Sequence, residues 1–434
     1  MKTIEQKAKK VPTIRFAGFE DEWVNKIFRE SFTYLQNNTL SRAELNSESG
    51  LAKNIHYGDV LVKFGECIDV AEEKIPFVSD AFVVDKFKNS FLQDGDIVIA
   101  DTAEDETVGK CTEMQGVNDA ILLSGLHTIP SRPKEKYGSK FLGYYLNSSA
   151  YRQQLLPLMQ GVKVLSISKS ALQETNLVIP KDNQEQQKIG SFFSNIDSLI
   201  LLEQKKYDKL MQVKKSMLEK MFPKEGATVP EIRFAGFSGD WVWKELDDII
   251  VRIATGLNPR DNFKLNSGGS NYYVTIKNFE HGHLYLDEKC DRIDDCALQL
   301  IQARSDLQKD DLLFSSIGRI GDCYLIKNNP QNWNINESVF TLRPNKAIAA
   351  SNYLFHVVHC DIVLSQILDS VTGSTFKSIK IGDLKKALIP IPCKEEQIQI
   401  ANYLDNLDSL VSLQQRKLEK LKNIKKSLLE KMFV

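Results

Sequence analysis

The 434-residue sequence has none of the motifs that mark the commonest nucleotide-dependent enzymes. It contains no GxxxxGK[ST] phosphate loop, no GxGxxG dinucleotide turn and no Asp/Asn-Pro-Pro-aromatic run of an amino-methyltransferase. A nuclease-like Glu-x-Lys triplet occurs at residues 72–74, downstream of Asp59 and Asp69, but the triplet recurs at residues 5–7 and 203–205. A triplet this frequent carries little weight as a nuclease centre, so we predict no catalytic residues in the chain.

Long apolar runs and a regular cysteine pattern are also missing. No run approaches the roughly 18 apolar residues that span a bilayer, and the opening MKTIEQKAKK has no apolar core of a secretory signal. The seven cysteines are odd in number and widely scattered, which favours reduced thiols over a disulfide framework. We therefore expect a cytoplasmic protein that does not associate with a membrane.

Metal-ligand spacings are scarce. One cluster of zinc-type side chains, His281, His283, Cys290 and Cys296, lacks the CxxC or HxxxH spacing of structural zinc sites. We therefore predict no bound metal.

Charge of one sign is not in excess either, because the chain has 56 lysines and arginines and 57 acidic residues. Such a balance excludes a protein that coats nucleic acid by electrostatics alone, so DNA binding requires local basic patches or charge from partners.

What the chain does have is an internal duplication. Residues 214–222, KKSMLEKMF, recur at residues 425–433 as KKSLLEKMF, and residues 11–24, VPTIRFAGFEDEWV, recur at residues 229–242 as VPEIRFAGFSGDWV. The period of about 210 residues is far above the range of solenoid repeats, so the chain is a duplicated domain plus helix. Trp23 and Trp241 close the second repeat, and we expect both in domain cores.

Apolar residues at spacings of three and four over residues 189–221 and 400–432 predict two long helices. The spacing is sustained enough for a coiled-coil seam, and each helix would be about 50 Å long. Pairing with another chain is one alternative, but duplication within one chain favours antiparallel self-pairing about a pseudo-two-fold axis. The domain prediction is residues 1–180 and 223–392, with helices at residues 181–222 and 393–434.

The two bodies are predicted to be mixed α/β, with short strands and a helix near the end of each. The expected strands are residues 60–64, 97–100, 120–123, 272–276, 312–314, 324–326 and 339–342. One helix is expected at residues 139–160 and one at 351–372, with Ser139 and Ser351 as N-caps. The interiors of the halves align poorly although their frameworks repeat, which suits two similar domains that bind different targets.

Polar loops and Gly-led segments supply the candidate DNA contacts. Arginine and lysine donate to guanine edges, asparagine pairs with adenine, and glycine lets backbone amides approach phosphate. In the first half the candidates are Lys63, Thr102, Lys110, Lys163 and Lys169; in the second half they are Thr255, Asn258, Lys277, Ser316, Arg319, Ser374 and Lys377. The two Gly-led segments are residues 161–167 and 373–379, for which a plain helix cap is the alternative reading.

The combined motifs resemble the specificity subunit of type I restriction–modification enzymes over nearly the whole chain. They are the two IRFAGF openings, GDVLVKFGE at residues 58–66, GDIVIADTAEDETVGK at 95–110, SSIGRIG at 315–321 and the run into each helix that ends in KMF. The resemblance implies two α/β target recognition domains joined by two long antiparallel coiled-coil helices with pseudo-two-fold symmetry. Cys393 to Glu395 departs from the pattern, because the usual second proline and a clear N-cap are missing.

The resemblance also implies the function and the partners. Each recognition domain would read one part of a bipartite DNA site, and two methyltransferase subunits carrying S-adenosylmethionine would bind the helices. A restriction and translocation subunit using ATP and Mg2+ would complete the complex, while this chain would bind no cofactor. A scaffold protein that joins other proteins through a coiled coil, without DNA, is the alternative from a different class. A self-contained nuclease–methyltransferase is a third, which the missing motifs disfavour.

Overall fold

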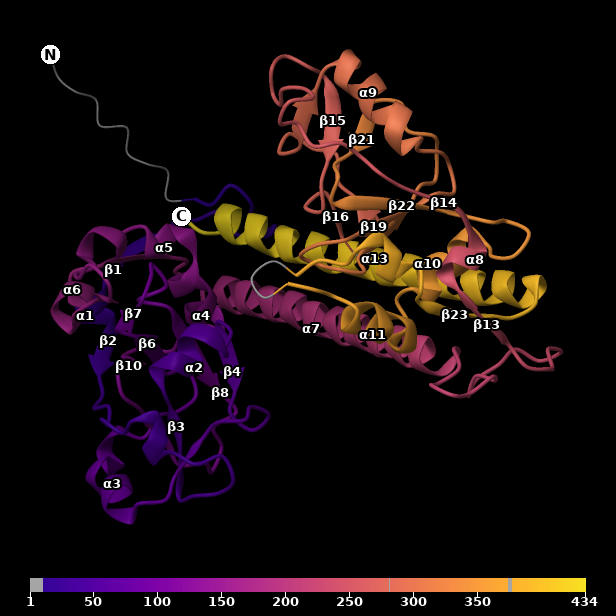
Figure 1. Ribbon diagram of the computed structural model, residues 1–434. Helices are drawn as coiled ribbons and strands as arrows, with labels where there is room; N and C mark the ends of the chain where they lie inside the picture. Colours follow the sequence, from indigo (N-terminus) through magenta and orange to yellow (C-terminus); the bar gives the residue numbers. More distant parts are fainter. Residues whose placement is uncertain (1–10, 281, 374–376) are drawn as a thin grey trace, which may run out of the picture. The chain divides into compact units, whose positions relative to one another are not determined.

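The computed structural model describes residues 11–280, 282–373 and 377–434. The chain divides into two compact units, Met1–Gln204 with Arg416–Val434 (unit 1) and Lys205–Gln415 (unit 2). The long helices are α7 (Asn183–Lys220) and α13 (Lys394–Met432), drawn in magenta and yellow in Figure 1. Unit 1 therefore holds the start of α7 and the end of α13, and unit 2 holds the end of α7 and the start of α13.

Unit 1 is built on two small sheets and two strand pairs. The main sheet has the order β2 (Phe32–Tyr34), β10 (Thr128–Pro133), β6 (Ile97–Ala100), β8 (Cys111–Gln115) and β4 (Cys67–Asp69). The second sheet has the order β5 (Phe77–Val78), β3 (Ala52–Ile55) and β9 (Leu122–Ser124), with β3 and β9 parallel. The pairs are β1 (Val24–Ile27) with β12 (Asn176–Ile179) and β7 (Thr102–Ala103) with β11 (Leu165–Ser166).

Unit 2 shares most of this topology, with four strands in its main sheet instead of five. Its main sheet has the order β14 (Ile250–Thr255), β22 (Val339–Pro344), β19 (Leu312–Ser315) and β20 (Cys323–Leu325). Its second sheet has the order β18 (Asp291–Ile293), β15 (Asn271–Val274) and β21 (Trp333–Ile335), again with a parallel pair, β15 and β21. The pairs are β13 (Val242–Glu245) with β23 (Leu388–Ile391) and β16 (Phe279–Glu280) with β17 (His283–Leu284). Both units are mixed α/β, as the sequence predicted.

The short helices correct two expectations. They are α1 (Phe28–Ser31), α2 (Tyr57–Val62), α3 (Ala81–Lys86), α4 (Phe141–Asn147), α5 (Ser149–Arg152), α6 (Lys169–Gln173), α8 (Leu246–Ile249), α9 (Asp295–Ser305), α10 (Ser351–Val357), α11 (Asp361–Asp369) and α12 (Ile381–Leu384), with 3₁₀ turns at Arg42–Glu44, Lys88–Ser90 and Leu156–Leu158. The predicted strand at residues 60–64 is wrong, because His56 accepts from Gly58 N and starts α2 there. Each predicted helix before a Gly-led segment is interrupted, and neither serine is its N-cap: Lys140 precedes α4, and Ser351 lies inside α10.

The repeated KMF ending completes the core of the unit in which it lies. In unit 1, Phe433 at the end of α13 packs on Trp23 and Phe193, with ring centroids 6.4 and 5.8 Å apart. In unit 2, Phe222 just after α7 packs on Trp241 at 6.2 Å. Both tryptophans are 2% exposed, which confirms their predicted place in the two cores. Each core therefore combines the opening motif of one half with the helix end of the other half.

The Glu-Gln pair near the start of each long helix links the helix to its unit. Gln186 accepts from Gly138 N and donates to Pro180 O, and Gln397 accepts from Ala350 N and donates to Pro392 O. Asp182 caps the first helix by accepting from Gln184 N at 2.7 Å. Glu185, three residues after Asp182, is paired with Arg15 of the opening motif.

Lysines of the KKS motif also form ion pairs within the units. Lys425 lies 2.6 Å from Asp197 and 2.9 Å from Glu66 in unit 1. The equivalent Lys214 lies 2.5 Å from Asp408 in unit 2. Equivalent lysines of the two long helices therefore neutralise carboxylates of the protein. Within the described residues, none of the helices combines the length and apolar character that a membrane crossing requires.

Candidate nucleic-acid interface

Three loops of unit 1 meet where their strands end. They follow β3 at residues 56–57, β6 at residues 101–103 and β9 at residues 125–127, and we call them loop cluster 1. Asp101 N donates to His127 O at 3.1 Å, and Gly125 N donates to Ile55 O at 2.8 Å. The cluster forms because parallel β3 and β9 end at the same edge, while the end of β6 pairs with the start of β10.

Unit 2 holds its loops with the same backbone hydrogen bonds. Ser316 N donates to Ser338 O at 3.1 Å, and Asn336 N donates to Val274 O at 2.9 Å. Residues 275–277, 316–319 and 336–338 are therefore the counterparts of the three loops in unit 1, and we call them loop cluster 2. Loops on a fixed scaffold are common places for binding side chains.

The Gly-led segments join both clusters. Ile167 N donates to Asp101 O at 2.8 Å in unit 1, and Ile379 N donates to Ser316 O at 3.0 Å in unit 2. Paired backbone hydrogen bonds link Gln160 with Ser166 at 2.8–2.9 Å in unit 1, and Thr372 with Ser378 at 3.0 Å in unit 2. The Gly-led segments are therefore more than plain helix caps, because each also forms a backbone hydrogen bond with the loop that follows β6 in unit 1 or β19 in unit 2.

Side chains in loop cluster 1 form a small polar and aromatic group. Thr102 Oγ1 donates to Asp101 Oδ1 at 2.7 Å, and His127 Nδ1 lies 3.2 Å from the same oxygen. The His127 ring packs edge-on against Tyr57, with centroids 5.3 Å apart. Burial lowers the pKa of the neighbouring His56. Among these side chains of loop cluster 1, only Thr102 was named as a candidate from the sequence. His127 could also have been found, because it is a histidine in the turn between two apolar strands.

Loop cluster 2 has different side chains on the same frame. Arg319 donates through Nη2 to Ile276 O and Phe279 O, at 3.0 and 2.8 Å, and through Nε to Asp322. Ser316 is 4% exposed and donates to Ser338 O, so its hydroxyl is part of the frame. Lys277 is exposed at the end of its loop. Arg319 Nη1 also lies 3.3 Å from Glu280, so the arginine ties the loops of cluster 2 together while its charge is paired with two carboxylates.

The end of β14 reaches the same cluster in unit 2. Gly256 N donates to Asn336 O at 3.2 Å, and a Cβ at this glycine would lie 1.7 Å from Ile335 O. Only glycine allows this approach, which places the residue after β14 against Ile335 and Asn336. Thr255 Oγ1 accepts from Arg304, and Asn258 O accepts from Asn262.

The remaining candidates lie in different settings. Lys163 and Lys377 are exposed in the two Gly-led segments, whereas Ser374 lies outside the described residues. Lys169 lies over the Tyr34 ring, 5.8 Å from its centroid. Lys63 donates to Lys74 O beside a cavity of about 1150 Å³. Lys110 donates to Leu61 O and Phe64 O, and burial lowers its pKa, so its ammonium holds the loop before β4.

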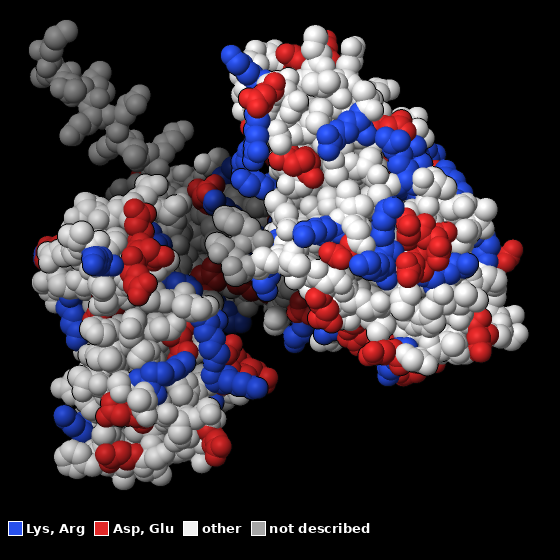
Figure 2. Space-filling model, viewed as in Figure 1, with Lys and Arg blue, Asp and Glu red and all other residues white. Residues whose placement is uncertain are grey.

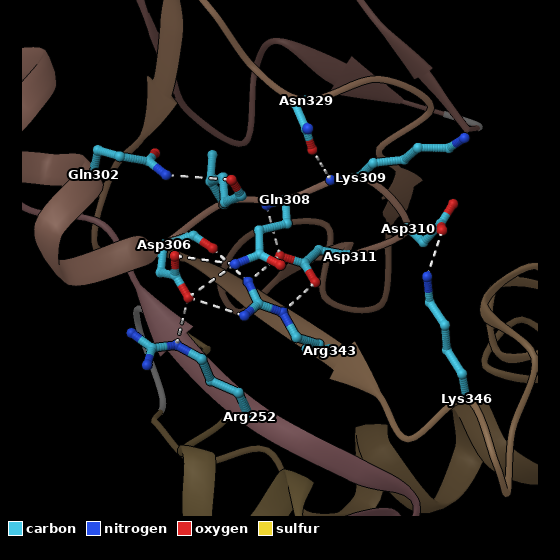
Figure 3. A network of polar contacts seen from close by, with 11 residues as sticks. Arg252, Gln302, Asp306, Gln308, Lys309, Asp310, Asp311, Asn329, Arg343 and Lys346 are labelled. Carbon is cyan, nitrogen blue, oxygen red and sulfur yellow. Dashed lines mark hydrogen bonds and ion pairs between the residues drawn. The ribbon is translucent and has the colours of Figure 1, made fainter.

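An arginine–aspartate ion pair also recurs in both units, at the ends of the central strands that lie away from the loop clusters. Arg343 donates to both oxygens of Asp311, at 2.8 and 2.9 Å, and the same carboxylate accepts from Gln308 N (Figure 3). Asp306 extends this network toward Arg252. In unit 1, Arg132 donates to both oxygens of Asp96 at 2.7–2.9 Å. The hydrogen bond that Arg132 donates to Asp96 raises the pKa of Arg132.

Surface charge is mixed rather than uniformly basic. Figure 2 shows blue and red side chains interleaved over the visible face of each unit, as the balanced composition predicted. Among the residues that the structure describes, no group of three or more His, Cys, Asp and Glu side chains is placed to hold a metal ion. Cys290 is buried and accepts from Asn278 Nδ2 at 2.9 Å, while His281 lies outside the described part.

Two units with one backbone frame and different loop side chains define a duplicated recognition protein. Comparison with known proteins gives the same class. The family model described as "Type I restriction modification DNA specificity domain" matches residues 66–212 and 238–423, about three quarters of the chain. The chain belongs to this family, and its function is that of a DNA specificity subunit of a type I restriction–modification system.

Individual relatives agree over most of their length. The provisionally named type I restriction enzyme MjaX specificity subunit of Methanocaldococcus jannaschii is 24% identical over 341 residues, covering 77% of this chain and 76% of that protein. The EcoKI specificity subunit of Escherichia coli is 23% identical over 320 residues, covering 70% and 66%. The crystal structure of the M. genitalium S subunit matches 98% of this chain and 99% of its own, with TM-score 0.55 and 14% identity, which shows a shared fold.

Proposed function

We propose that each unit reads one half of a bipartite DNA target through its loop cluster. The proposal rests mainly on one observation: three equivalent backbone hydrogen bonds hold both loop clusters, while the side chains of the two clusters differ. A repeated frame gives both units one way to approach DNA, and different side chains give two different sequences. The relatives with printed names are DNA specificity subunits, so the scaffold alternative has no support.

The proposed contacts combine base and phosphate recognition. In unit 1 they are Thr102, Lys163 and Lys169, and in unit 2 they are Thr255, Asn258, Lys277, Arg319 and Lys377. Lysine and arginine suit guanine edges or phosphates, and asparagine suits adenine. Lys63 and Ser374 stay predictions, and Lys110 and Ser316 act by holding the loops that carry the other contacts.

The two long helices are proposed as an antiparallel coiled-coil spacer that sets the distance between the half-sites. Within unit 1, Asp197 of α7 pairs with Lys425 of α13, and Glu203 six residues later pairs with Lys417. Contacts in this reverse order, and the equivalent pair of Lys214 with Asp408 in unit 2, support a pseudo-two-fold arrangement. Helices of 38 and 39 residues are about 57 Å long, enough to separate half-sites by one DNA turn of about 34–36 Å.

The chain is proposed to act inside a larger cytoplasmic complex. Two methyltransferase subunits would bring S-adenosylmethionine and restriction/translocation subunits would bring ATP and Mg2+, while this chain binds double-stranded DNA and no cofactor. A formal net charge of −1 supports this division, because much of the phosphate attraction must come from partners. One structural neighbour, with TM-score 0.54, has a title on complex assembly of the type I R-M system.

Exchange of one recognition domain tests the proposal. Residues 1–178 are replaced by the corresponding domain of another specificity subunit, and methylated sites are mapped in cells that express the whole complex. One half of the target should change while the other half and the spacer stay the same. A change in both halves contradicts independent reading by the two units.

A gel-shift series tests DNA binding itself. The full chain, with and without its methyltransferase partner, is titrated on a target duplex at several salt concentrations. Specific binding through phosphates predicts an affinity that falls steeply with salt. A chain that never binds DNA under any of these conditions would restore the scaffold alternative.

A further inference from the structure

Asp101 is the residue of loop cluster 1 whose position is most closely controlled. It directly follows β6, whose four residues are all buried at 2% exposure or less. Its backbone N donates to His127 O at 3.1 Å, and its backbone O accepts from Ile167 N at 2.8 Å. The residue is therefore held from two sides before its side chain makes any contact.

The Asp101 carboxylate is oriented and only half satisfied. Oδ1 accepts from Thr102 Oγ1 at 2.7 Å and lies 3.2 Å from His127 Nδ1. Within the described residues, no hydrogen bond or ion pair engages Oδ2, and the side chain is 28% exposed. Oδ2 is thus an acceptor on a rotamer that two neighbours hold in place, which is the geometry of a preorganised binding group.

The counterpart in unit 2 shows that the frame does not need this carboxylate. Ser316 occupies the same backbone position, with the same two hydrogen bonds, and its hydroxyl is turned inward to Ser338 O. Cluster 2 places the exposed cation Lys277 nearby instead. A residue whose side-chain chemistry differs between identical frames is suited to recognition rather than to folding.

We propose that Asp101 is a specificity-determining residue of unit 1, and that its carboxylate accepts a hydrogen bond from a base with an exocyclic amino group in the major groove. This inference rests on the proposed function. Cytosine N4 and adenine N6 offer such a donor, whereas guanine O6 and thymine O4 are acceptors that a carboxylate repels. His127 acts as a positioning residue, and Thr102 positions the carboxylate in addition to its proposed DNA contact, because both side chains contact Asp101 Oδ1.

Selection of binding sites from a random duplex pool tests the proposal with the full chain and its methyltransferase partner. The wild type should select a two-part target with cytosine or adenine at one position of one half. Asp101→Ala should lose that preference by about fivefold or more at that position only, with the other half unchanged. Asp85→Ala is the matched control, since Asp85 is an exposed carboxylate on α3, which lies at the lower end of unit 1 in Figure 1, away from β7.

Modified bases give the decisive comparison. Replacing the selected adenine by purine, or the selected cytosine by 2-pyrimidinone, removes only the amino group. Wild-type affinity should fall about fivefold or more, and the affinity of Asp101→Ala should not change. Selection of adenine or of cytosine distinguishes the two amino bases.

Failures of the two hypotheses look different. If Asp101→Ala keeps the wild-type preference at every position, or remains sensitive to the missing amino group, Asp101 does not read the base. If the wild type selects no two-part target at all, the proposed function itself fails. Continued reading by Asp101→Ala of the remaining positions in the half-site that unit 1 reads shows that unit 1 is folded in the variant. Asp101→Asn, which keeps an acceptor for Thr102, provides a second variant should the alanine variant unfold.

Discussion

The Arg15 guanidinium donates from Nε and Nη2 to the two carboxylate oxygens of Glu185, at 2.7 and 2.8 Å, across 170 positions of sequence. Arg233 forms the same pair with Glu396 in unit 2, at 2.7 Å for both contacts. The pairs join the opening motif to the start of the long helix in both units. They explain why the arginine of IRFAGF and the glutamate of the Glu-Gln pair recur together in both halves.

Removing this pair should destabilise unit 1. Glu185 is 1% exposed, so Arg15→Ala leaves a buried carboxylate without its partner and should cost about 3 kcal/mol of unfolding free energy. Urea unfolding of the full chain measures this cost. Arg29→Ala, which removes an exposed pair with Glu174, is the control and should cost less than about 1 kcal/mol. If both variants lost the same unfolding free energy, burial of Glu185 would not explain the destabilisation by Arg15→Ala.

The end of α13 packs into the core of unit 1, and the end of α7 packs into the core of unit 2. A mutation at either helix end should therefore loosen helices that are far from it in sequence. Phe433→Ala creates a cavity beside Trp23 and should cost about 3–5 kcal/mol. Hydrogen exchange should speed up in α4 of unit 1 and not in α10 of unit 2. Phe222→Ala is the matched variant and should give the reverse pattern, because its side chain packs on Trp241. Loosening of α10 by Phe433→Ala would contradict this assignment.

The buried carboxyl of Glu113 should make unit 1 sensitive to pH. Burial raises its pKa from 4.5 to about 7, although the amides of Gly143 and Lys140 donate to it. The folded state therefore keeps a proton that the unfolded state releases. The contribution of this group to stability is complete below about pH 4.5 and falls by about 3 kcal/mol as the pH rises through 7.

Glu113→Gln removes this titration. The difference in unfolding free energy between the variant and the wild type should change in favour of the variant between pH 4.5 and 7. Only the pH dependence of the difference is compared, so a constant effect of the new amide does not matter. A difference that stays constant over this range would show that Glu113 does not titrate there.

Helix length should control the spacer of the DNA target. Inserting one heptad into residues 204–212 and one into residues 415–423 lengthens both helices by about 10 Å, or about 3 base pairs. Mapping of methylated sites should find a longer spacer and unchanged half-sites. An insertion into α7 alone is the control, and it should impair assembly, since the two helices no longer match. Unchanged spacing with the double insertion would reject the spacer role.

Local sequence patterns were enough to predict much of the fold. Residues 97–100 were expected as a strand and form β6, because four apolar residues between glycine and aspartate positions suit a buried strand. Residues 60–64 also include four apolar residues, but residues 60–62 form part of α2, since the His56 side chain caps the start of that helix. A short apolar run does not distinguish the two, and a cap contact decides between them.

By itself, the sequence determined the duplication, the two long helices, the buried tryptophans and the absence of the enzyme motifs that were sought. These follow from repeats and from periodicity, which are local properties of the chain. Only the tertiary structure decided that Phe433 belongs to the core with Trp23, and that Asp101, Thr102 and His127 meet in one cluster. Such contacts join distant positions through strand pairing and core packing, so no spacing in the sequence records them.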